Sequence, residues 1–205
     1  MPEPEFPLFA LGLVALPGEL IPLHNFEARY RAMMAHCLGS GSEFGIVWMA
    51  DDGLHDIGCA MVIEQVLEEL EDGRMNILTR GTRPFRIIER QADLPYPAGI
   101  VEFLTDSEGA SDDTLTQGAH EAYADLVRRA TDRDPTAEEL AEMDSYDMAA
   151  TVDFGADAKQ GLLDLRSENA RLKLVTRLFR AASKRLDFVD RAQARARSNG
   201  KVRFG

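Results

Sequence analysis

The feature that most constrains the fold is a pair of long apolar segments joined by one tight turn. Residues 57–70 and 74–91 have the composition of strands, and Asp72-Gly73 stands between them. An Asp-Gly pair between such segments is a strong signal of a β-hairpin. Gly81 lies inside the returning segment, where a glycine indicates a bulge or a break. The sequence therefore predicts a long antiparallel hairpin that is interrupted near Gly81.

Other parts of the first half add further strands and no βαβ rhythm. Pro17-Gly18 predicts a type II turn, because proline fixes φ and glycine accepts the positive φ that follows. Pro22 lies in the next apolar run, so that strand is expected at a sheet edge or to be irregular. Residues 44–50 and 99–104 are two more predicted strands. Short strands, tight turns and one helix favour a small mixed β barrel.

The one helix of this half begins where the apolar period changes from two to about 3.6. A single helical face is predicted to carry Phe26, Tyr30, Met33, Met34 and Cys37. Gly39 and Gly41 supply its C-terminal stop. We interpret this stripe as a core-facing surface rather than a ligand site.

The second half has a helical period almost throughout. Helices are expected at 120–130, 136–143, 145–155, 158–165 and from 167 onward, with Asp134-Pro135 opening the second of them. The fold class is therefore α+β, a small mixed barrel with one inserted helix followed by a helical bundle. The expected domains are a β domain (1–104), an acidic linker (105–114), a helical bundle (115–190) and a basic, disordered tail (191–205).

Charge and cysteine content exclude several classes of protein. The net charge of −12 disfavours nucleic-acid binding, although residues 159–205 carry 13 basic and 4 acidic groups. That basic end either meets an acidic partner or is a solvated helix face. The two cysteines form no zinc motif, and we expect both to be buried apolar groups. Without a basic, uninterrupted N-terminal leader or a run of 18 apolar residues, a cytoplasmic location and no membrane span are expected.

The order of these segments resembles the amino-terminal domain of the Lon protease, which is also found in stand-alone bacterial proteins and in cereblon. The resemblance rests on LFALGLVALPGELIPLHNFEARYRAM, FGIVW, IGCAMVIEQVLEELEDGRMNILTRGTRPFRI and the helical block YDMAATVDFGADAKQGLLDLRSENARLKLVTRLF. These blocks are spread over residues 8–179, which is most of the chain. The sequence departs from the usual pattern at Ala10, Ala15, Asn25, Ala28 and Pro84. The resemblance implies a PUA-like β domain followed by a helical bundle, in a region that helps Lon to recognise substrates and to assemble.

The catalytic motifs of a full Lon protease are not present in this sequence. It has no GxxxxGK[ST] phosphate loop. Ser183 and Lys184 are neighbours on a predicted helix, and neighbours point about 100° apart, so they do not form a nucleophile–base pair. We therefore expect no enzymatic activity, no cofactor and no metal site. His24 stands at a strand-to-helix corner, where we expect its imidazole to bond backbone amides.

The leading functional hypothesis is a non-catalytic module that binds peptides, unfolded segments or a partner protein, as an adaptor or regulator. Aromatic anchors dominate such contacts, so the candidate binding residues are Trp48, Phe85, Tyr96 and Phe103, some of which are expected to be core. Arg83 is added because it could bind a peptide carboxylate. We favour a structural role for it, in which it pairs with a buried carboxylate or a backbone carbonyl and holds the Gly81 bulge. The alternative hypothesis is an RNA-binding PUA-like module.

Overall fold

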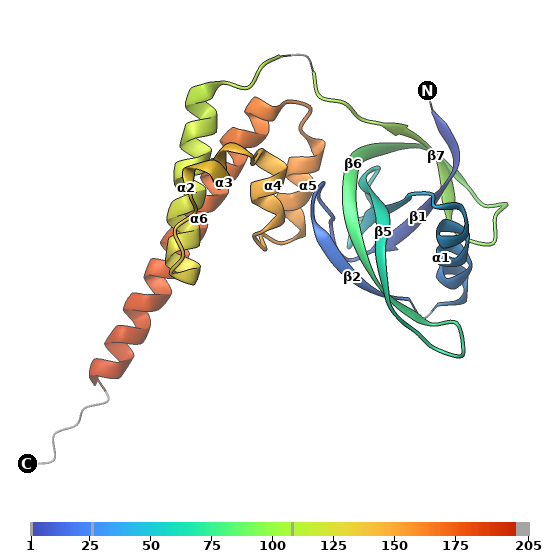
Figure 1. Cartoon of the computed structure of the whole chain (residues 1–205), viewed down its shortest axis with the longest axis horizontal. Coiled ribbons are helices and arrows are strands. Elements are labelled where there is room, and N and C mark those ends of the chain that lie inside the picture. Colours follow the sequence, from blue (N-terminus) through green and yellow to red (C-terminus); the bar gives the residue numbers. More distant parts are fainter. Residues whose placement is uncertain (1, 26, 108, 200–205) are drawn as a thin grey trace, which may run out of the picture. The chain divides into compact units, whose positions relative to one another are not determined.

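The protein is described by a computed structural model that covers residues 2–25, 27–107 and 109–199. The chain divides into two compact units. The first unit contains Met1–Gly109 and Tyr146–Ser167, and the second contains Ala110–Ser145 and Glu168–Gly205. Figure 1 labels the helices and strands of both units.

The first unit is built on a closed, mixed β barrel. Its strands are β1 (Glu3–Leu11), β2 (Leu20–Asn25), β3 (Phe44–Ala50), β4 (Gly53–Leu54), β5 (Ile57–Glu69), β6 (Met75–Gln91) and β7 (Ala98–Phe103). They pair in the order β1-β7-β6-β5-β3-β4, and a parallel pairing of β1 with β3 closes the ring (Figure 1). This arrangement confirms the predicted small mixed barrel.

The predicted hairpin is formed by β5 and β6, with Gly73 in its turn at a φ of 79°. The first half of β6 pairs with β2 as well as β5, and its second half pairs with β7 as well as β5. Register shifts by one residue between the pairs Cys59–Pro84 and Met61–Gly81. The predicted bulge next to Gly81 is therefore confirmed, and it separates the two halves of β6.

The turn that precedes β2 is hydrogen-bonded to Gly81. Glu19 N donates to Leu16 O over 3.1 Å, and Gly18 has a φ of 78°, as a Pro-Gly type II turn requires. Gly18 N donates to Gly81 O and Gly81 N donates to Glu19 O, both over 2.9 Å. The turn is thus tied to β6 at the bulge, and it leads the chain directly into β2.

The barrel interior and the helix α1 (Ala28–Ser40) bury most large apolar side chains of this unit. The interior cluster comprises Phe6, Leu8, Val47, Ala60, Phe85, Ile87 and Val101. Four residues of the predicted helical stripe, Tyr30, Met33, Met34 and Cys37, are buried. Phe26 lies outside the described residues. The helix ends before Gly41, which adopts the left-handed conformation with a φ of 67°.

Two short helices from later in the chain complete the first unit: α4 (Ser145–Ala150), from Tyr146 onward, and α5 (Ala156–Asp164). Gln160 on α5 donates from Nε2 to Ile57 O of β5 over 3.1 Å. Met148, Leu162 and Leu163 are almost wholly buried. This division differs from the expected one, in which residues 115–190 formed a single bundle. Their amphipathic pattern predicted short helices but could not indicate against which surface they pack.

The second unit consists of α2 (Asp113–Thr131), α3 (Ala137–Ala141) and α6 (Glu168–Asn199). Asp112 N donates to Asn169 Oδ1 over 2.7 Å at one end of the α2–α6 pair, and Arg129 is paired with Asp187 near the other end. These contacts show that α2 and α6 run in the same direction. The tyrosine ring of Tyr123 packs against Phe179 between them, with 5.4 Å between the ring centroids.

Several helix boundaries in this unit differ from the expected ones. Helix α2 begins at Asp113, inside the expected linker and seven residues before the expected start at residue 120. The N-cap of α3 is Thr136, which forms a capping box with Glu139, whereas the expected cap, Asp134, is paired with Arg128. Helix α6 continues to Asn199, beyond residue 190 where the bundle was expected to end. Residues 200–205 of the expected tail lie outside the described part of the chain.

Candidate functional site

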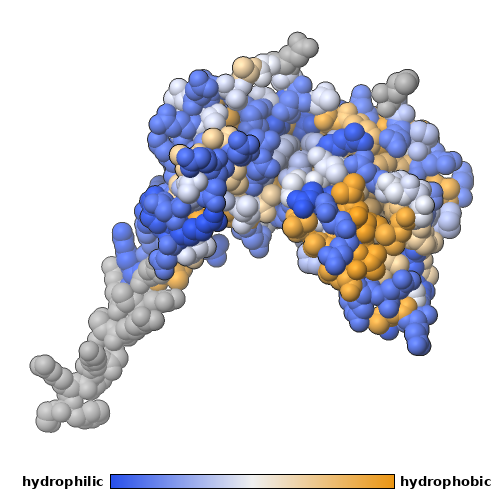
Figure 2. All heavy atoms as spheres, viewed as in Figure 1, coloured by the Kyte–Doolittle hydropathy of each residue, from blue (hydrophilic) through white to orange (hydrophobic). Residues whose placement is uncertain are grey.

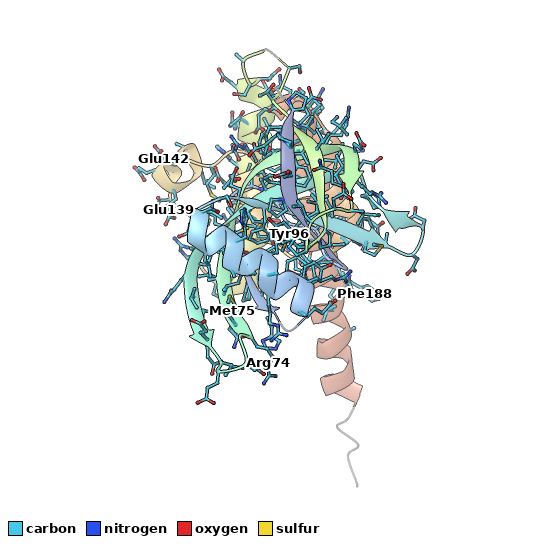
Figure 3. All side chains as sticks on the ribbon, turned by 90° about the vertical axis from the view of Figure 1, so that its right-hand side faces the viewer. Arg74, Met75, Tyr96, Glu139, Glu142 and Phe188 are labelled. Atoms are coloured by element: carbon cyan, nitrogen blue, oxygen red, sulfur yellow. The ribbon has the colours of Figure 1, made fainter. Side chains whose placement is uncertain are left out.

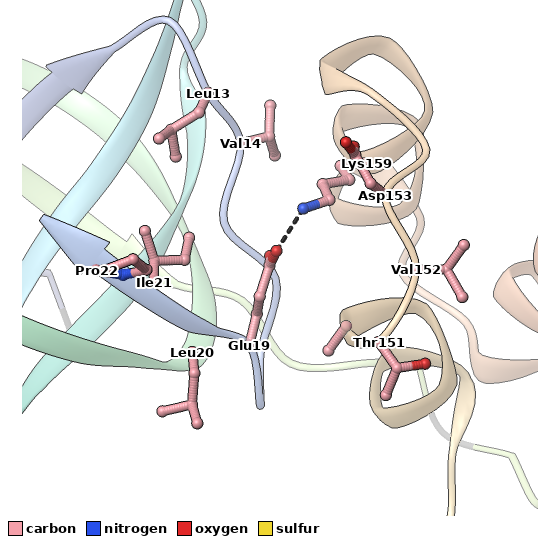
Figure 4. Close-up of a pocket in the computed structure, with 11 residues that line it drawn as sticks. Leu13, Val14, Glu19, Leu20, Ile21, Pro22, Thr151, Val152, Asp153 and Lys159 are labelled. Atoms are coloured by element: carbon pink, nitrogen blue, oxygen red, sulfur yellow. Dashed lines mark hydrogen bonds and ion pairs between the residues drawn. The ribbon is translucent and has the colours of Figure 1, made fainter. Parts of the chain in front are cut away.

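The candidate site is a surface groove along β2, formed by two hollows that share Pro22. The first hollow, of about 430 Å³, lies between β2 and the connection of α4 to α5 (Figure 4). Its lining includes Leu13, Val14, Leu20, Ile21, Pro22, Val152 and Asp153. The second, of about 520 Å³, is lined by Pro22, Leu23, His24, Leu67, Glu68, Asn76 and Ile77. We call the two hollows together the β2 groove.

The local sequence explains why this surface is open. Among the described strands, β2 pairs with β6 alone, so its other edge is not covered by a strand. Ile21 and Leu23 are buried, and Leu20 and Pro22 alternate with them and are exposed. Proline is tolerated at such an edge because its nitrogen has no hydrogen to pair. The predicted edge position of Pro22 is thus confirmed.

One wall of the groove is held by a shielded ion pair. Glu19 and Lys159 are paired, and each side chain is only 12% exposed (Figure 4). Glu19 also accepts a hydrogen bond from Leu16 N over 3.0 Å through its other carboxylate oxygen. Because Lys159 belongs to α5, this pair joins the turn before β2 to the helix across the hollow. The groove is therefore a shaped feature of the first unit and does not depend on the second.

The floor and rim of the groove expose apolar side chains. Leu20, in the first hollow, is 48% exposed, and Leu67, in the second, is 52% exposed. Figure 2 shows a broad apolar area on this face of the first unit, over β2, β5 and β6. Contiguous apolar surface of this kind typically marks a binding site.

A chain of hydrogen bonds crosses three strands at the second hollow. His24 Nδ1 lies 2.6 Å from Asn76 Oδ1, and Asn76 Nδ2 donates to Glu68 Oε2 over 2.7 Å. His24 therefore bonds a side chain of β6, and the expected bond from its imidazole to backbone amides stays a prediction. The polar chain fixes the position of the Glu68 carboxylate at the rim.

Three of the predicted binding residues lie together on the barrel. Arg83 pairs with Glu43 over 2.7 Å, and its guanidinium lies 3.8 Å from the centroid of the Phe103 ring. Phe103 is half-buried and packs edge-on against Phe6. Phe85 is wholly buried in the interior cluster, so its ring is not available to a ligand. Arg83 thus pairs with a carboxylate, but Glu43 is partly exposed and not buried, so both interpretations of Arg83 stay predictions.

The other two candidates have separate surroundings. Trp48 is half-buried and stacks on His55, with 4.5 Å between ring centroids and 13° between ring planes. Tyr96 is 9% exposed and lies beside His36 of α1, at 5.7 Å between centroids (Figure 3). Burial raises the pKa of the Tyr96 hydroxyl. None of the five candidates lines the two hollows described above.

In the sequence, the groove was indicated by its edge strand and not by the aromatic residues that we had selected as candidates. Leu20 and Leu67 had no feature that separated them from core residues, because exposure depends on which strands are neighbours. Pro22 was the one residue in the sequence that marked this edge.

Groups that could carry catalysis are placed unfavourably in the described structure. Ser183 is buried whereas Lys184 is exposed, so the two side chains diverge. Both cysteines are buried as expected, and desolvation raises the pKa of the Cys37 and Cys59 thiols. Within residues 2–25, 27–107 and 109–199, no three His, Cys, Asp or Glu side chains are grouped to hold a metal ion. None of the described helices combines the length and apolarity needed to cross a bilayer.

Comparisons with known proteins agree with this architecture. A crystal structure of a Lon N-terminal domain protein from Xanthomonas campestris is 26% identical, with a TM-score of 0.62, and covers 82% of this chain and 95% of that one. The N-terminal domain of a Lon protease from the Mycobacterium avium complex has a TM-score of 0.63 at 19% identity, covering 85% and 97% of the two chains, which supports the fold alone.

The sequence comparisons identify the family. Lon protease 2 of Myxococcus xanthus is 24% identical over 182 residues, which are 81% of this chain but only 22% of that protein. Residues 5–181 match the family described as the ATP-dependent protease La (LON) substrate-binding domain. Since this match includes most of the chain, with parts of both compact units, the protein belongs to the LON substrate-binding domain family.

Proposed function

We propose that this chain is a non-catalytic binding module that holds extended apolar segments of other proteins in the β2 groove. The observation that carries the proposal is the half-exposure of Leu20 and Leu67 on the two sides of Pro22, in hollows shaped by the fold. A segment that covered these leucines would remove their remaining apolar surface from water, which favours binding. Membership of a substrate-binding family supports a role in recognition. The buried, free cysteines suit a reducing cytoplasm.

Pro22 limits how such a segment binds. A bound peptide often extends a sheet by pairing with the backbone of an edge strand. Pro22 removes one amide donor from the middle of β2, which makes this edge a poor template. We therefore assign the affinity to side chains that enter the two hollows, not to an added strand.

The charges of the first unit argue against the RNA-binding alternative. Five of its arginines, Arg29, Arg74, Arg80, Arg83 and Arg90, are already paired with carboxylates. Binding to phosphates requires basic groups that can replace counterions. The continuous basic stripe that this alternative would need on the barrel is thus interrupted by acidic partners.

Peptide capture can be tested with a protein that cannot refold. The probe is a reduced, carboxymethylated and fluorescein-labelled protein, and binding is followed by fluorescence anisotropy. The double variant Leu20→Ser and Leu67→Ser should bind about tenfold more weakly, because roughly half of two leucine surfaces is no longer covered. As a matched control, Ile88→Ser removes an apolar residue that is 54% exposed outside the groove, and it should bind as the parent does. Equal affinities of the parent and the double variant would refute the proposal.

The non-catalytic part of the proposal has its own test. Purified chain is incubated with casein, with and without ATP, and the products are separated by electrophoresis. Intact casein is expected. Cleavage that disappears in Ser183→Ala would contradict it.

A further inference from the structure

The negative charge of the chain belongs to the unit that contains the β2 groove. The first unit carries 9 basic and 22 acidic residues, whereas the second carries 14 basic and 13 acidic residues. The first unit therefore has a net charge of −13 and the second a net charge of +1. A field of this size attracts cationic ligands and raises their association rate.

At the groove, the cations are neutralised. Lys159 is paired with Glu19 on one wall, and Arg80 is paired with Glu64 over 2.6 Å on the neighbouring strands. Neither cation is therefore available to attract an acidic ligand.

Two other carboxylates at the groove accept hydrogen bonds from neutral donors. Asp153 lines the first hollow and accepts from Gly155 N over 3.1 Å. Glu68 lines the second hollow and accepts from Asn76 Nδ2 over 2.7 Å. Both donors are neutral, so they orient the carboxylates without cancelling their charge. Both acidic residues are exposed. One charged carboxylate therefore borders each hollow, with the apolar side chains of Leu20, Pro22 and Leu67 beside them.

We propose that the β2 groove selects apolar segments that carry a lysine or arginine on each side. The proposal rests on the proposed function and names its ligand class. The hollows follow one another along Leu20–His24, and an extended chain rises about 3.3 Å per residue, so roughly three to five apolar residues separate the two basic ones. The apolar residues enter the hollows, and the basic side chains reach Asp153 and Glu68.

The experiment uses three fluorescein-labelled peptides that share one four-residue apolar core and differ in their flanks: Lys, Ser or Glu on both sides. With the full chain at low salt, the Lys-flanked peptide should bind about tenfold more tightly than the Ser-flanked peptide, and the Glu-flanked peptide most weakly. The difference should shrink as sodium chloride rises to about 0.5 M, because exposed charges are screened.

Variants that remove one negative charge each distinguish the effect of the two carboxylates at the groove from the effect of the net charge of the unit. Asp153→Asn and Glu68→Gln keep their hydrogen-bond acceptors, so each should lower the ratio of Lys-flanked to Ser-flanked affinity and leave the Ser-flanked affinity unchanged. Asp93→Asn, an exposed acidic residue of the same unit outside the groove, is the matched control and should leave the ratio unchanged. An equal loss in all three variants would assign the preference to net charge and overturn the role of the rim.

The binding results distinguish a groove without basic preference from a groove that does not bind apolar segments at all. If the three peptides bind equally well and the Leu20/Leu67 double variant binds none of them, the groove binds apolar segments but has no basic preference. If none of the peptides binds to the parent chain, the proposed function fails as well.

Discussion

Gly81 lies where the turn of residues 16–19 meets β6. A Cβ atom at this position would lie 2.0 Å from Leu16 O and 2.8 Å from Leu16 C, far inside contact distance. Both atoms belong to the backbone, so no side-chain rotation can relieve the overlap. The two hydrogen bonds that join this turn to Gly81 would have to lengthen, and the start of β2 would move with them.

Gly81→Ala should therefore destabilise the fold by about 1–3 kcal/mol, the usual cost of forcing extra atoms into a packed site. The free energy of unfolding is measured by urea titration with circular dichroism. Gly12→Ala is the matched control, because a Cβ atom there meets nothing within 4 Å, and it should change stability by less than about 0.5 kcal/mol. Equal midpoints for the two variants would contradict the close approach of Leu16 to β6.

At the residue scale, the sequence predicted features that depend on local backbone geometry better than it predicted side-chain burial, which depends on neighbouring strands. The turn at Pro17-Gly18 and the edge position of Pro22 follow from φ and from a missing amide donor. The burial of Phe85 could not be read in the same way, because the bulge after Gly81 shifts which residues of β6 face inward. The exposure of Leu20 and Leu67 was not predicted either, because it depends on which strands lie beside them and not on a local sequence pattern.

At the element scale, the start of α6 is fixed by a shielded polar cluster in the second unit. Arg171 is 3% exposed and donates from Nη2 to Glu168 Oε2 over 2.8 Å and from Nε to Ser145 Oγ over 3.0 Å. Glu168 also accepts from Ser145 N over 2.9 Å. The cluster thus joins the first turn of α6 to the residue that begins α4.

Removing the carboxylate should be costly because it takes an ion-pair partner away from a buried guanidinium. Glu168→Ala is expected to lower the free energy of unfolding by about 3–5 kcal/mol, measured by urea titration. Asp56→Ala breaks the exposed pair with Arg90, in which the side chains are 71% and 58% exposed, and should cost less than about 1 kcal/mol. A loss for Glu168→Ala no larger than for the control would show that the cluster is not a stabilising contact.

Most elements were predictable from the sequence, and their partners were not. The strand predicted at 44–50 matches β3, and the hairpin predicted at 57–91 matches β5 and β6 within about a residue. The parallel pairing of β1 with β3 closes the barrel, yet these strands lie more than thirty residues apart in sequence. A pattern of period two defines the two faces of a strand but not its neighbours. The same limit applies to α4 and α5, whose apolar faces did not indicate the barrel.

At the scale of the whole molecule, the chain passes between the two units three times, after Gly109, Ser145 and Ser167. The described residues from 105 to 112 are exposed and lack regular secondary structure, so a protease should cut there first. That single cut leaves α5 on the C-terminal fragment, although Lys159 and Gln160 bind Glu19 and Ile57 of the N-terminal one.

The two fragments should therefore remain associated after nicking. Limited Glu-C digestion followed by native size-exclusion chromatography should give one peak that contains both fragments, and urea should separate them. Nicked fragments that elute separately without denaturant would contradict the packing of α5 on the barrel. A first cut inside residues 57–91 would contradict the placement of the accessible loop at 105–112.

The late position of α5 in the chain also sets an order of events on the ribosome. All seven strands have been synthesised by Phe103, but Lys159 and Gln160 follow more than fifty residues later. At a translation rate of about 5–20 residues per second, the newly made barrel waits roughly 3–12 s for the helix that covers the side next to β2. During that interval, Glu19 lacks its cation and the apolar wall beside it is open to other nascent chains. The surface that we assign to the capture of apolar segments is therefore also the last part of the first unit to be protected during its own synthesis.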